Sequence, residues 1–294
     1  MNVKLSRQII FASGLLLGLL ATLAVAGDNF ERGLLWQIEK PGNPPSYLFG
    51  TMHIEDPEVV TLATPVQAVF DKADNVTLEV VLDPQSLLAM ATAFMLTDGS
   101  NLESHIGSQL YQRSVRAMAT HGMPEMMVAR MKPWAVAVTL MTPPPETGVV
   151  LDLMLYQEAM ARGKPVFGLE TPMEQMSLFD SFSKSDQIAL LKDTLEHMDE
   201  IPRMFADLKA AYLDRDLARL VKLSNDSMPD NNPGLVDDLN RKLIVERNHR
   251  MVERMLPLLK ERQQFIAVGA LHLPGEQGLL QLLNDQGYSV TVVY

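Results

Sequence analysis

Short apolar runs of β type alternate with longer segments of helical periodicity along most of this 294-residue chain. Six runs have the length and residue types of strands. They lie at residues 34–38, 47–49, 76–81, 165–169, 265–268 and 289–294. Alternation of this kind is typical of domains in which helices cover a central sheet. We therefore predict an α/β fold with a mixed central sheet and helices on its faces.

Between and after these runs, apolar residues recur at spacings of three and four, as in helices that bury one face. The expected helices span residues 58–73, 84–96, 105–121, 126–140, 149–162, 185–224 and 235–262. No strand pattern interrupts residues 181–262, so we expect a largely helical segment there beside the sheet. The loops at 142–145 and 225–234 do not resemble long linkers. We therefore expect residues 27–294 to form a single domain.

The first 26 residues have the pattern of an export signal. Lys4 and Arg7 precede an apolar run over residues 9–20, and Ala24-Val25-Ala26 has the small-x-small pattern of a cleavage site. We predict a signal peptide cleaved after Ala26 and a periplasmic or secreted protein. The alternative is an uncleaved anchor, because residues 9–26 approach the length that spans a bilayer. After cleavage we expect no stable membrane insertion.

Composition and missing motifs exclude several functions. The chain has 36 acidic against 25 basic residues and a formal charge of −11, so we expect no nucleic-acid partner. It has no cysteine, which excludes thiolate metal sites, Fe–S clusters and a cysteine nucleophile. A metal would therefore bind His, Asp or Glu. The motifs H-E-x-x-H, G-x-S-x-G, G-x-G-x-x-G and the P-loop are absent, which disfavours zincin proteases, common serine hydrolases, dinucleotide redox and nucleotide hydrolysis.

Two of the six histidines lie in matching contexts. Residues 46–53 and 265–272 are each an apolar run followed by G-x-x-H, ending in His53 and His272. We expect the glycine to let the chain leave the sheet with unusual backbone angles. The imidazole would then project over the carboxyl end of the strand, where α/β sheets bind ligands. Two such histidines could share a divalent cation or a proton transfer, or each could be a structural turn residue.

Two glutamates accompany these histidines in or beside predicted strands. Glu79 lies inside the apolar run 76–81, and Glu170 lies at a strand end. A buried carboxylate needs a cation, a metal or strong donors, whereas an outward-facing one on a half-exposed strand does not. Two histidines with one or two carboxylates would suit Zn, Mn or Co, and a glutamate that binds no metal could act as a general base.

Several of these segments carry a family resemblance. They are G-T-M-H at 50–53, the strand Glu79, G-L-E-T at 168–171 with Gln175, and residues 268–280. Together they resemble the TraB/GumN family, which is related to the Tiki proteases. The resemblance covers nearly all of residues 30–294 and implies an α/β fold distantly like the erythromycin-esterase and ChaN proteins.

The resemblance also implies roles for particular residues. Because Tiki members are regarded as divalent-metal-dependent proteases, it implies His53, Glu79 and His272 as ligands or catalytic groups, with Glu170 as a fourth member. Arg247, followed by Asn248, matches a recurrent position. Such an arginine could hold a site carboxylate or a substrate oxyanion, or it could be a surface charge of a helix. Asp152 could likewise lie behind the site or be an exposed helix residue.

The resulting expectation is an exported hydrolase that uses a divalent metal (Mn, Co or Zn) to cleave a peptide or related acyl bond in a peptide or small-molecule substrate. Two alternatives stay open. One is a metal-free, esterase-like hydrolase in which a histidine is the base. The other is a non-catalytic protein that binds a metal or another ligand in the same cleft.

Overall fold

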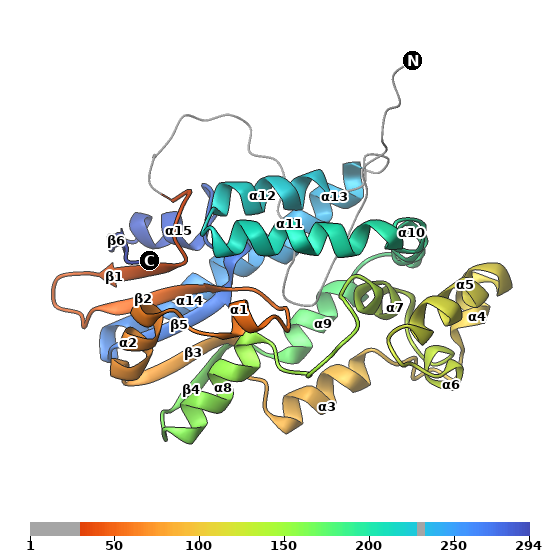
Figure 1. The fold of residues 1–294 in the computed structure, drawn as a ribbon, viewed down its shortest axis with the longest axis horizontal. Coiled ribbons are helices and arrows are strands. Elements are labelled where there is room, and N and C mark those ends of the chain that lie inside the picture. The colour runs from red at the N-terminus through yellow and green to blue at the C-terminus, as the bar shows by residue number, and fades with distance from the viewer. Residues whose placement is uncertain (1–29, 228–232) are drawn as a thin grey trace, which may run out of the picture.

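The computed structural model describes residues 30–227 and 233–294, so the predicted signal peptide lies outside the described residues. Within them, six strands form one mixed sheet in the order β4-β3-β5-β2-β1-β6 (Figure 1). β4, β3, β5 and β2 run parallel, and β1 is antiparallel to both β2 and β6. The strands are β1 (Leu35–Glu39), β2 (Ser46–Thr51), β3 (Asn75–Val80), β4 (Val166–Glu170), β5 (Gln264–Gly269) and β6 (Ser289–Val292). The predicted α/β fold with a mixed sheet is confirmed.

Helices occupy most of the remaining chain, and in Figure 1 the group α4 to α6 lies at the end of the molecule far from β6. The helices are α1 (Pro57–Val60), α2 (Thr64–Lys72), α3 (Pro84–Ala93), α4 (Leu102–Ile106), α5 (Ser108–Ala119), α6 (Glu125–Val128), α7 (Pro133–Leu140), α8 (Leu151–Ala161), α9 (Pro172–Asp180), α10 (Lys184–Glu196), α11 (Ile201–Leu213), α12 (Leu217–Asp226), α13 (Pro233–Asn240), α14 (Glu246–Glu261) and α15 (Leu279–Asp285). Shorter helical turns are η1 (Met198–Glu200), the π-helical η2 (Arg241–Val245) and η3 (Ala270–His272). None of the described helices is long and apolar enough to cross a bilayer.

Proline divides two of the helices that the sequence predicted as continuous. The expected helix 58–73 is two helices, α1 and α2, and Pro65 stands near the start of the second. The expected helix 126–140 is likewise α6 and α7, the second of which begins at Pro133. A proline ring clashes with the carbonyl four residues earlier and cannot donate to it, so each helix restarts there. The segment 181–262 is largely helical where it is described, as predicted, and Asp216 within it forms an isolated bridge with Arg32.

The adjacent interior strands β3 and β5 are buried along their whole length. Burial on both faces is typical of parallel strands covered by helices. Glu79 lies in β3 and is only 3% exposed. The alternative of an outward-facing Glu79 on a half-exposed strand is therefore wrong, and its carboxylate needs partners inside the protein.

The parallel strands carry four of the predicted site residues to one edge of the sheet. His53 follows β2, Glu79 is the next-to-last residue of β3, Glu170 ends β4, and His272 ends the turn η3 that follows β5. Val80 pairs in register with Glu170, so the carboxyl ends of β3 and β4, which carry the two glutamates, lie at the same height in the sheet. The carboxyl edge of a parallel sheet is where α/β folds bind ligands.

Gly50 brings the two G-x-x-H segments into contact. A Cβ at position 50 would lie 2.8 Å from Cδ1 of Leu273 and 3.1 Å from Cα of Ala270. Neither glycine of the two motifs has a positive φ, and Gly269 has φ −52°. The expectation of unusual backbone angles at these glycines is therefore wrong. Gly50 is needed because the two segments touch there.

Candidate active site

Two carboxylates and one guanidinium form a buried cluster beneath the carboxyl edge of the sheet. Nη2 of Arg247 contacts Oε1 of Glu79 and lies 2.7 Å from Oε2 of Glu170, which also accepts from Nε of Arg247 at 2.9 Å. The Arg247 side chain is only 3% exposed. Arg247 is therefore not a surface charge. It compensates two buried anions, each of which would be costly without it.

Arg247 owes its position to the start of α14. The π-helical turn η2 directly precedes this helix, and Nη1 of Arg247 donates to the carbonyl of Leu243 in that turn at 3.1 Å. One turn further along α14, Nη2 of Arg250 donates to Oε1 of Glu170 at 2.7 Å. Both oxygens of Glu170 are thus held by guanidinium groups of α14. Glu170 is a partner of these arginines and does not line the cavity described below.

Glu79 accepts hydrogen bonds at both oxygens. Nε2 of Gln175, on α9, donates to Oε1 at 2.8 Å, and the backbone N–H of Gly269 donates to Oε2 at 2.9 Å. Burial raises the pKa of Glu79, but the charge of Arg247, the neighbouring imidazoles of His272 and His53 and the N–H of Gly269 outweigh it and bring the pKa to about 2. Glu79 is therefore an anion throughout the neutral range.

His272 is buried and has a defined tautomer. Nδ2 of Asn248 donates to the carbonyl of Gln277 at 2.7 Å, which leaves Oδ1 of Asn248 facing Nδ1 of His272 at 2.6 Å. Because Oδ1 is an acceptor, Nδ1 carries the proton and Nε2 the lone pair. Nε2 lies 3.9 Å from Oε2 of Glu79. Burial and the charge of Arg247 lower the pKa of His272 to about 4, so its imidazole is neutral at pH 7.

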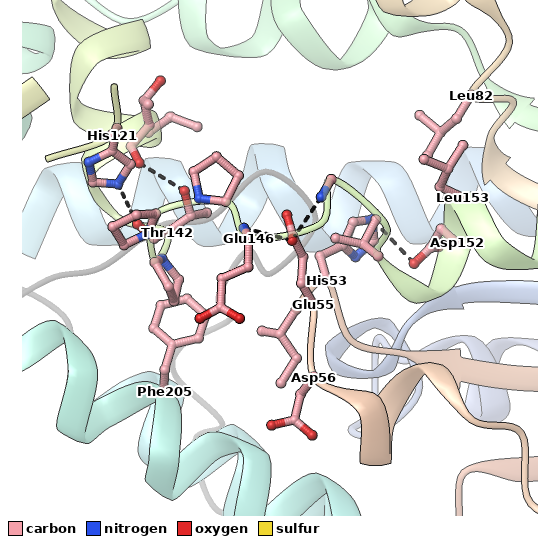
Figure 2. A pocket seen from close by; sticks show the side chains of 18 of the residues that line it. His53, Glu55, Asp56, Leu82, His121, Thr142, Glu146, Asp152, Leu153 and Phe205 are labelled. Atoms are coloured by element: carbon pink, nitrogen blue, oxygen red, sulfur yellow. Dashed lines mark hydrogen bonds and ion pairs between the residues drawn. The ribbon is translucent and has the colours of Figure 1, made fainter. Parts of the chain in front are cut away.

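His53 pairs with Asp152 at the edge of the cavity, and Figure 2 shows the pair with Asp152 on α8. Nε2 of His53 lies 3.4 Å from Oδ2 of Asp152, whose Oδ1 accepts from the hydroxyl of Thr51 at 3.0 Å. Asp152 is 3% exposed, so the exposed-helix alternative is wrong. Burial raises the pKa of Asp152. Among the described residues, Nδ1 of His53 and Oδ2 of Asp152 have no hydrogen-bond partner.

A cavity of about 820 Å³ opens above these groups (Figure 2). Its polar lining includes His53, Glu79, Asp152 and Gln175. His272, Glu170 and Arg247 are absent from the lining and lie beneath it. A ligand in the cavity would therefore meet His53 and Glu79 directly, and the remaining predicted residues support these two from behind.

The donors at this edge fit a divalent cation in their chemistry. They comprise the Nε2 lone pair of His272, a carboxylate oxygen of Glu79 and the unpartnered polar atoms of His53 and Asp152. Imidazole nitrogen with carboxylate oxygen suits Zn, Mn or Co. In residues 30–227 and 233–294, however, no three His, Asp or Glu side chains converge closely enough to hold an ion. An ion would have to draw the His53 and His272 pairs together.

Sequence reasoning named most of this site but misjudged the burial of two groups. Asp152 and Arg247 both lie in helices and were compatible with surface positions, yet each is buried against a predicted residue. Arg250 and Thr51 were not considered. Arg250 lies three residues after Arg247, a spacing that places both on one face of a helix and could have identified it.

Comparison with known proteins supports the resemblance. Residues 34–292 match the model of the TraB/PrgY/gumN family. The chain is 28% identical over 313 aligned positions to "Metalloprotease TIKI2" of Danio rerio, an alignment that covers 87% of this chain and 60% of that protein. It is 28% identical over 312 positions to "Metalloprotease TIKI1" of Homo sapiens, with 87% and 61% covered.

The chain thus spans about three fifths of the length of the TIKI relatives it matches. A bacterial relative, "Uncharacterized protein YbaP" of Escherichia coli (strain K12), is 24% identical over 271 positions, which cover 89% of this chain and 96% of that protein. No solved structure matches the chain. Because the family model spans nearly all of the described sheet and every residue of the site, this chain belongs to the TraB/PrgY/gumN family.

Proposed function

We propose that this chain is an exported hydrolase that cleaves peptide bonds in the cavity above His53 and Glu79. The proposal rests mainly on a contrast in hydrogen bonding at the cavity floor. Glu79 is held by Arg247, Gln175 and Gly269, whereas Nδ1 of His53 has no hydrogen-bond partner and Oδ2 of Asp152 faces only Nε2 of His53, at 3.4 Å. Unpartnered buried polar atoms are rare, and a bound ligand, ion or water or a catalytic role accounts for many of them. The relatives named metalloproteases give the reaction class.

The pKa of about 2 at Glu79 assigns it an electrostatic role. A carboxylate of that pKa is a poor proton acceptor near pH 7. It is instead a permanent negative charge next to the neutral His272, able to hold a cation or to stabilise positive charge that develops on a neighbouring imidazole.

His53 is the group best placed to move a proton. Its Nε2 faces Asp152, which orients the ring and would stabilise an imidazolium, as a carboxylate does behind a catalytic histidine. Nδ1 is then free to accept a proton from water. Arg247 is a positioning residue in this proposal, because it contacts Glu79 and Glu170 and lies beneath the cavity lining.

A divalent cation fits the same donors. When bound, Mn, Co or Zn would polarise the scissile carbonyl and lower the pKa of a bound water. His53, Glu79 and His272 would hold it, as the family resemblance implies, and Asp152 would add a fourth donor, a carboxylate oxygen. The locked tautomer of His272 matches the arrangement in which a metal-bound imidazole gives its other N–H to a neighbouring acceptor.

A second candidate is metal-free hydrolysis with His53 as the base. It is favoured by the separation of the donors into two pairs, His53 with Asp152 and His272 with Glu79. Among the described residues, no three His, Asp or Glu side chains converge on one point. In both candidates residues 1–26 act as a cleaved export signal, which N-terminal sequencing of the exported protein checks.

The test is turnover of a library of internally quenched peptides by the purified protein, with and without chelator and with Mn, Co or Zn added. We expect Glu79→Gln and His53→Ala to lose at least about a hundredfold in kcat/KM, the scale of a lost acid–base or electrostatic group. His105→Ala, a histidine of α4 outside the cavity lining, should keep wild-type turnover.

Three results separate the candidates. Activity abolished by chelator and restored by metal supports the metal-dependent reaction, and activity indifferent to chelator supports His53 as a metal-free base. Turnover that survives in Glu79→Gln and His53→Ala, or no turnover of any peptide under any loading, overturns the proposal and leaves a binding protein.

A further inference from the structure

The cavity has an apolar part that the chemistry at its floor does not use. We propose that it selects peptide substrates with a large apolar side chain next to the scissile bond and rejects acidic ones. This inference rests on the proposed function, since it names the substrate class of the same site. It comes from the side chains of α3 and its neighbours and from the charges at the cavity wall.

α3 forms one part of the apolar wall. Leu87 and Met90 of this helix and its C-cap Phe94 line the cavity, joined by Phe205 of α11. The ring of Phe94 packs edge-on against Trp134, with ring centroids 5.1 Å apart, so this part of the wall is fixed. Leu87 is 46% exposed although it lines a cavity. A bound apolar side chain would cover it and gain the free energy of that burial.

The size and composition of the wall suit one large side chain within a short peptide. About 820 Å³ lies inside the range of sites that enclose small ligands. Met90 and Met123 both line it. Methionine is unbranched and adapts to several shapes, so we expect Leu, Met and Phe to be accepted alike.

The charged side chains of the wall oppose an acidic substrate. Glu55, Asp56 and Glu146 line the cavity. Oε2 of Glu55 already accepts from the backbone N–H groups of residues 146–148 (Figure 2), and two of these residues, Glu146 and Gly148, also line the cavity.

Lys209 is the one Lys or Arg among the described residues that line the cavity. Its ammonium group lies 2.5 Å from Oδ2 of Asp56 and 2.6 Å from Oε2 of Glu58. It is therefore committed to two carboxylates and offers no free positive charge to a substrate. An Asp or Glu side chain entering here would lose hydration and meet like charges.

The experiment compares two neighbouring leucines of α3. Leu87 lines the cavity, whereas Leu88 is 69% exposed and does not. Both are exposed enough that a polar replacement leaves the core intact. We measure kcat/KM for peptides that differ only in one central residue (Leu, Phe, Asp or Glu), using wild type, Leu87→Gln and Leu88→Gln. The same peptides are titrated by fluorescence anisotropy into the Glu79→Gln variant, alone and combined with either leucine change.

We expect wild type to prefer the Leu and Phe peptides over the acidic ones by at least about tenfold, the usual scale of apolar-pocket discrimination. Leu87→Gln should lower kcat/KM for the apolar peptides about fivefold, and Leu88→Gln should leave it unchanged. Affinity for the Glu79→Gln variant should follow the same order.

The two assays separate failure of this inference from failure of the proposed function. Turnover that depends on Glu79 but shows no preference, or equal effects of the two leucine variants, overturns the substrate class and leaves the hydrolase standing. Absence of turnover combined with Leu87-dependent binding of apolar peptides overturns the hydrolase and keeps the binding preference. Tighter binding of the acidic peptides overturns the inference outright.

Discussion

The two G-x-x-H segments look alike in sequence, yet their histidines meet different surroundings. His272 is buried, and its Nδ1 donates to Asn248. Its Nε2 faces Glu79, whose negative charge is compensated by Arg247. His53 reaches the cavity, pairs with Asp152 and keeps Nδ1 without a partner. The imidazole of His272 is therefore held in place by protein partners, whereas the imidazole of His53 keeps a ring nitrogen that a ligand could bind.

The difference arises from the helices that each segment meets. The η3 turn with His272 faces Asn248 of α14, the helix that also brings in Arg247. The chain after β2 instead meets the first turn of α8, which supplies a single carboxylate, Asp152, and no cation. A repeated sequence motif therefore sets where the two imidazoles lie, and the neighbouring helices set what each can do.

Removal of the cation that supports the His272 side should have the largest effect. Arg247→Met leaves Glu79 and Glu170 buried without their main partner. We expect the free energy of unfolding to fall by about 3–5 kcal/mol, as when one partner of a buried ion pair is deleted. Urea-induced unfolding followed by circular dichroism measures this loss.

The control lies on the same helix. Arg254 pairs with Glu174 near the surface, with a side chain 39% exposed, so Arg254→Met should cost less than about 1 kcal/mol. Adding Glu79→Gln and Glu170→Gln to Arg247→Met removes the unpaired charges and should recover most of the stability. Equal losses at Arg247 and Arg254 would contradict the view of Arg247 as the compensating cation.

Acid should weaken the His272 side in two successive pH windows. The unfolded chain protonates His272 below pH 6.5, but the folded chain does so only near pH 4, so stability falls as the pH drops through this interval. For Glu79 the pKa is 4.5 in the unfolded chain and about 2 in the folded one, so its contribution is present above pH 4.5 and is lost toward pH 2.

Unfolding measured from pH 7.5 to 2.5 tests these windows by their slopes. His272→Gln should flatten the curve between pH 6.5 and 4, and Glu79→Gln should flatten it below pH 4.5. Slopes measured in this way do not depend on how much each variant is destabilised overall. A wild-type curve that is level from pH 6.5 to 4 would show that His272 is not held neutral by its burial.

The sheet was predictable because each strand is patterned locally. All six strands begin and end within two residues of their predicted bounds, since apolar β-type runs between polar loops leave few alternatives. The helix breaks at Pro65 and Pro133 were missed because the helical spacing of apolar residues continues across each proline. The backbone helix cannot continue there, since proline has no N–H to donate and its ring clashes with the preceding turn.

Within the site, the residues on strands were easier to identify than those on helices. Glu79 stands out because it is the one charged residue of a strand that is buried along its whole length. Arg247 lies in E-R-N-H-R, a sequence that reads as a solvated helix face, and only its packing beneath the sheet makes it a core residue. The pairing of Asp152 with His53 joins residues 99 positions apart, and no local pattern encodes such a contact.

Metal binding should join the two dissimilar segments and gives the smallest expected effect. If a cation recruits His53 to the pair formed by Glu79 and His272, metal at a hundred times its Kd stabilises the folded protein by about 2.7 kcal/mol. The midpoint of thermal unfolding should then rise by several degrees with Mn, Co or Zn. We would measure it by calorimetry, together with the metal content of the purified protein.

The variants decide which segment the metal needs. His53→Ala and His272→Ala should each abolish the thermal shift, because each removes one of the imidazole ligands, while His121→Ala, a cavity histidine bonded to the carbonyl of Thr142, should keep it. A shift lost only in His272→Ala would place the ion on the buried side alone and leave His53 with Asp152 as a proton-transfer pair. A thermal shift retained in both His53→Ala and His272→Ala would rule out an ion shared by the two histidines. The His272 segment would then have an electrostatic role and the His53 segment a proton-transfer role in one site.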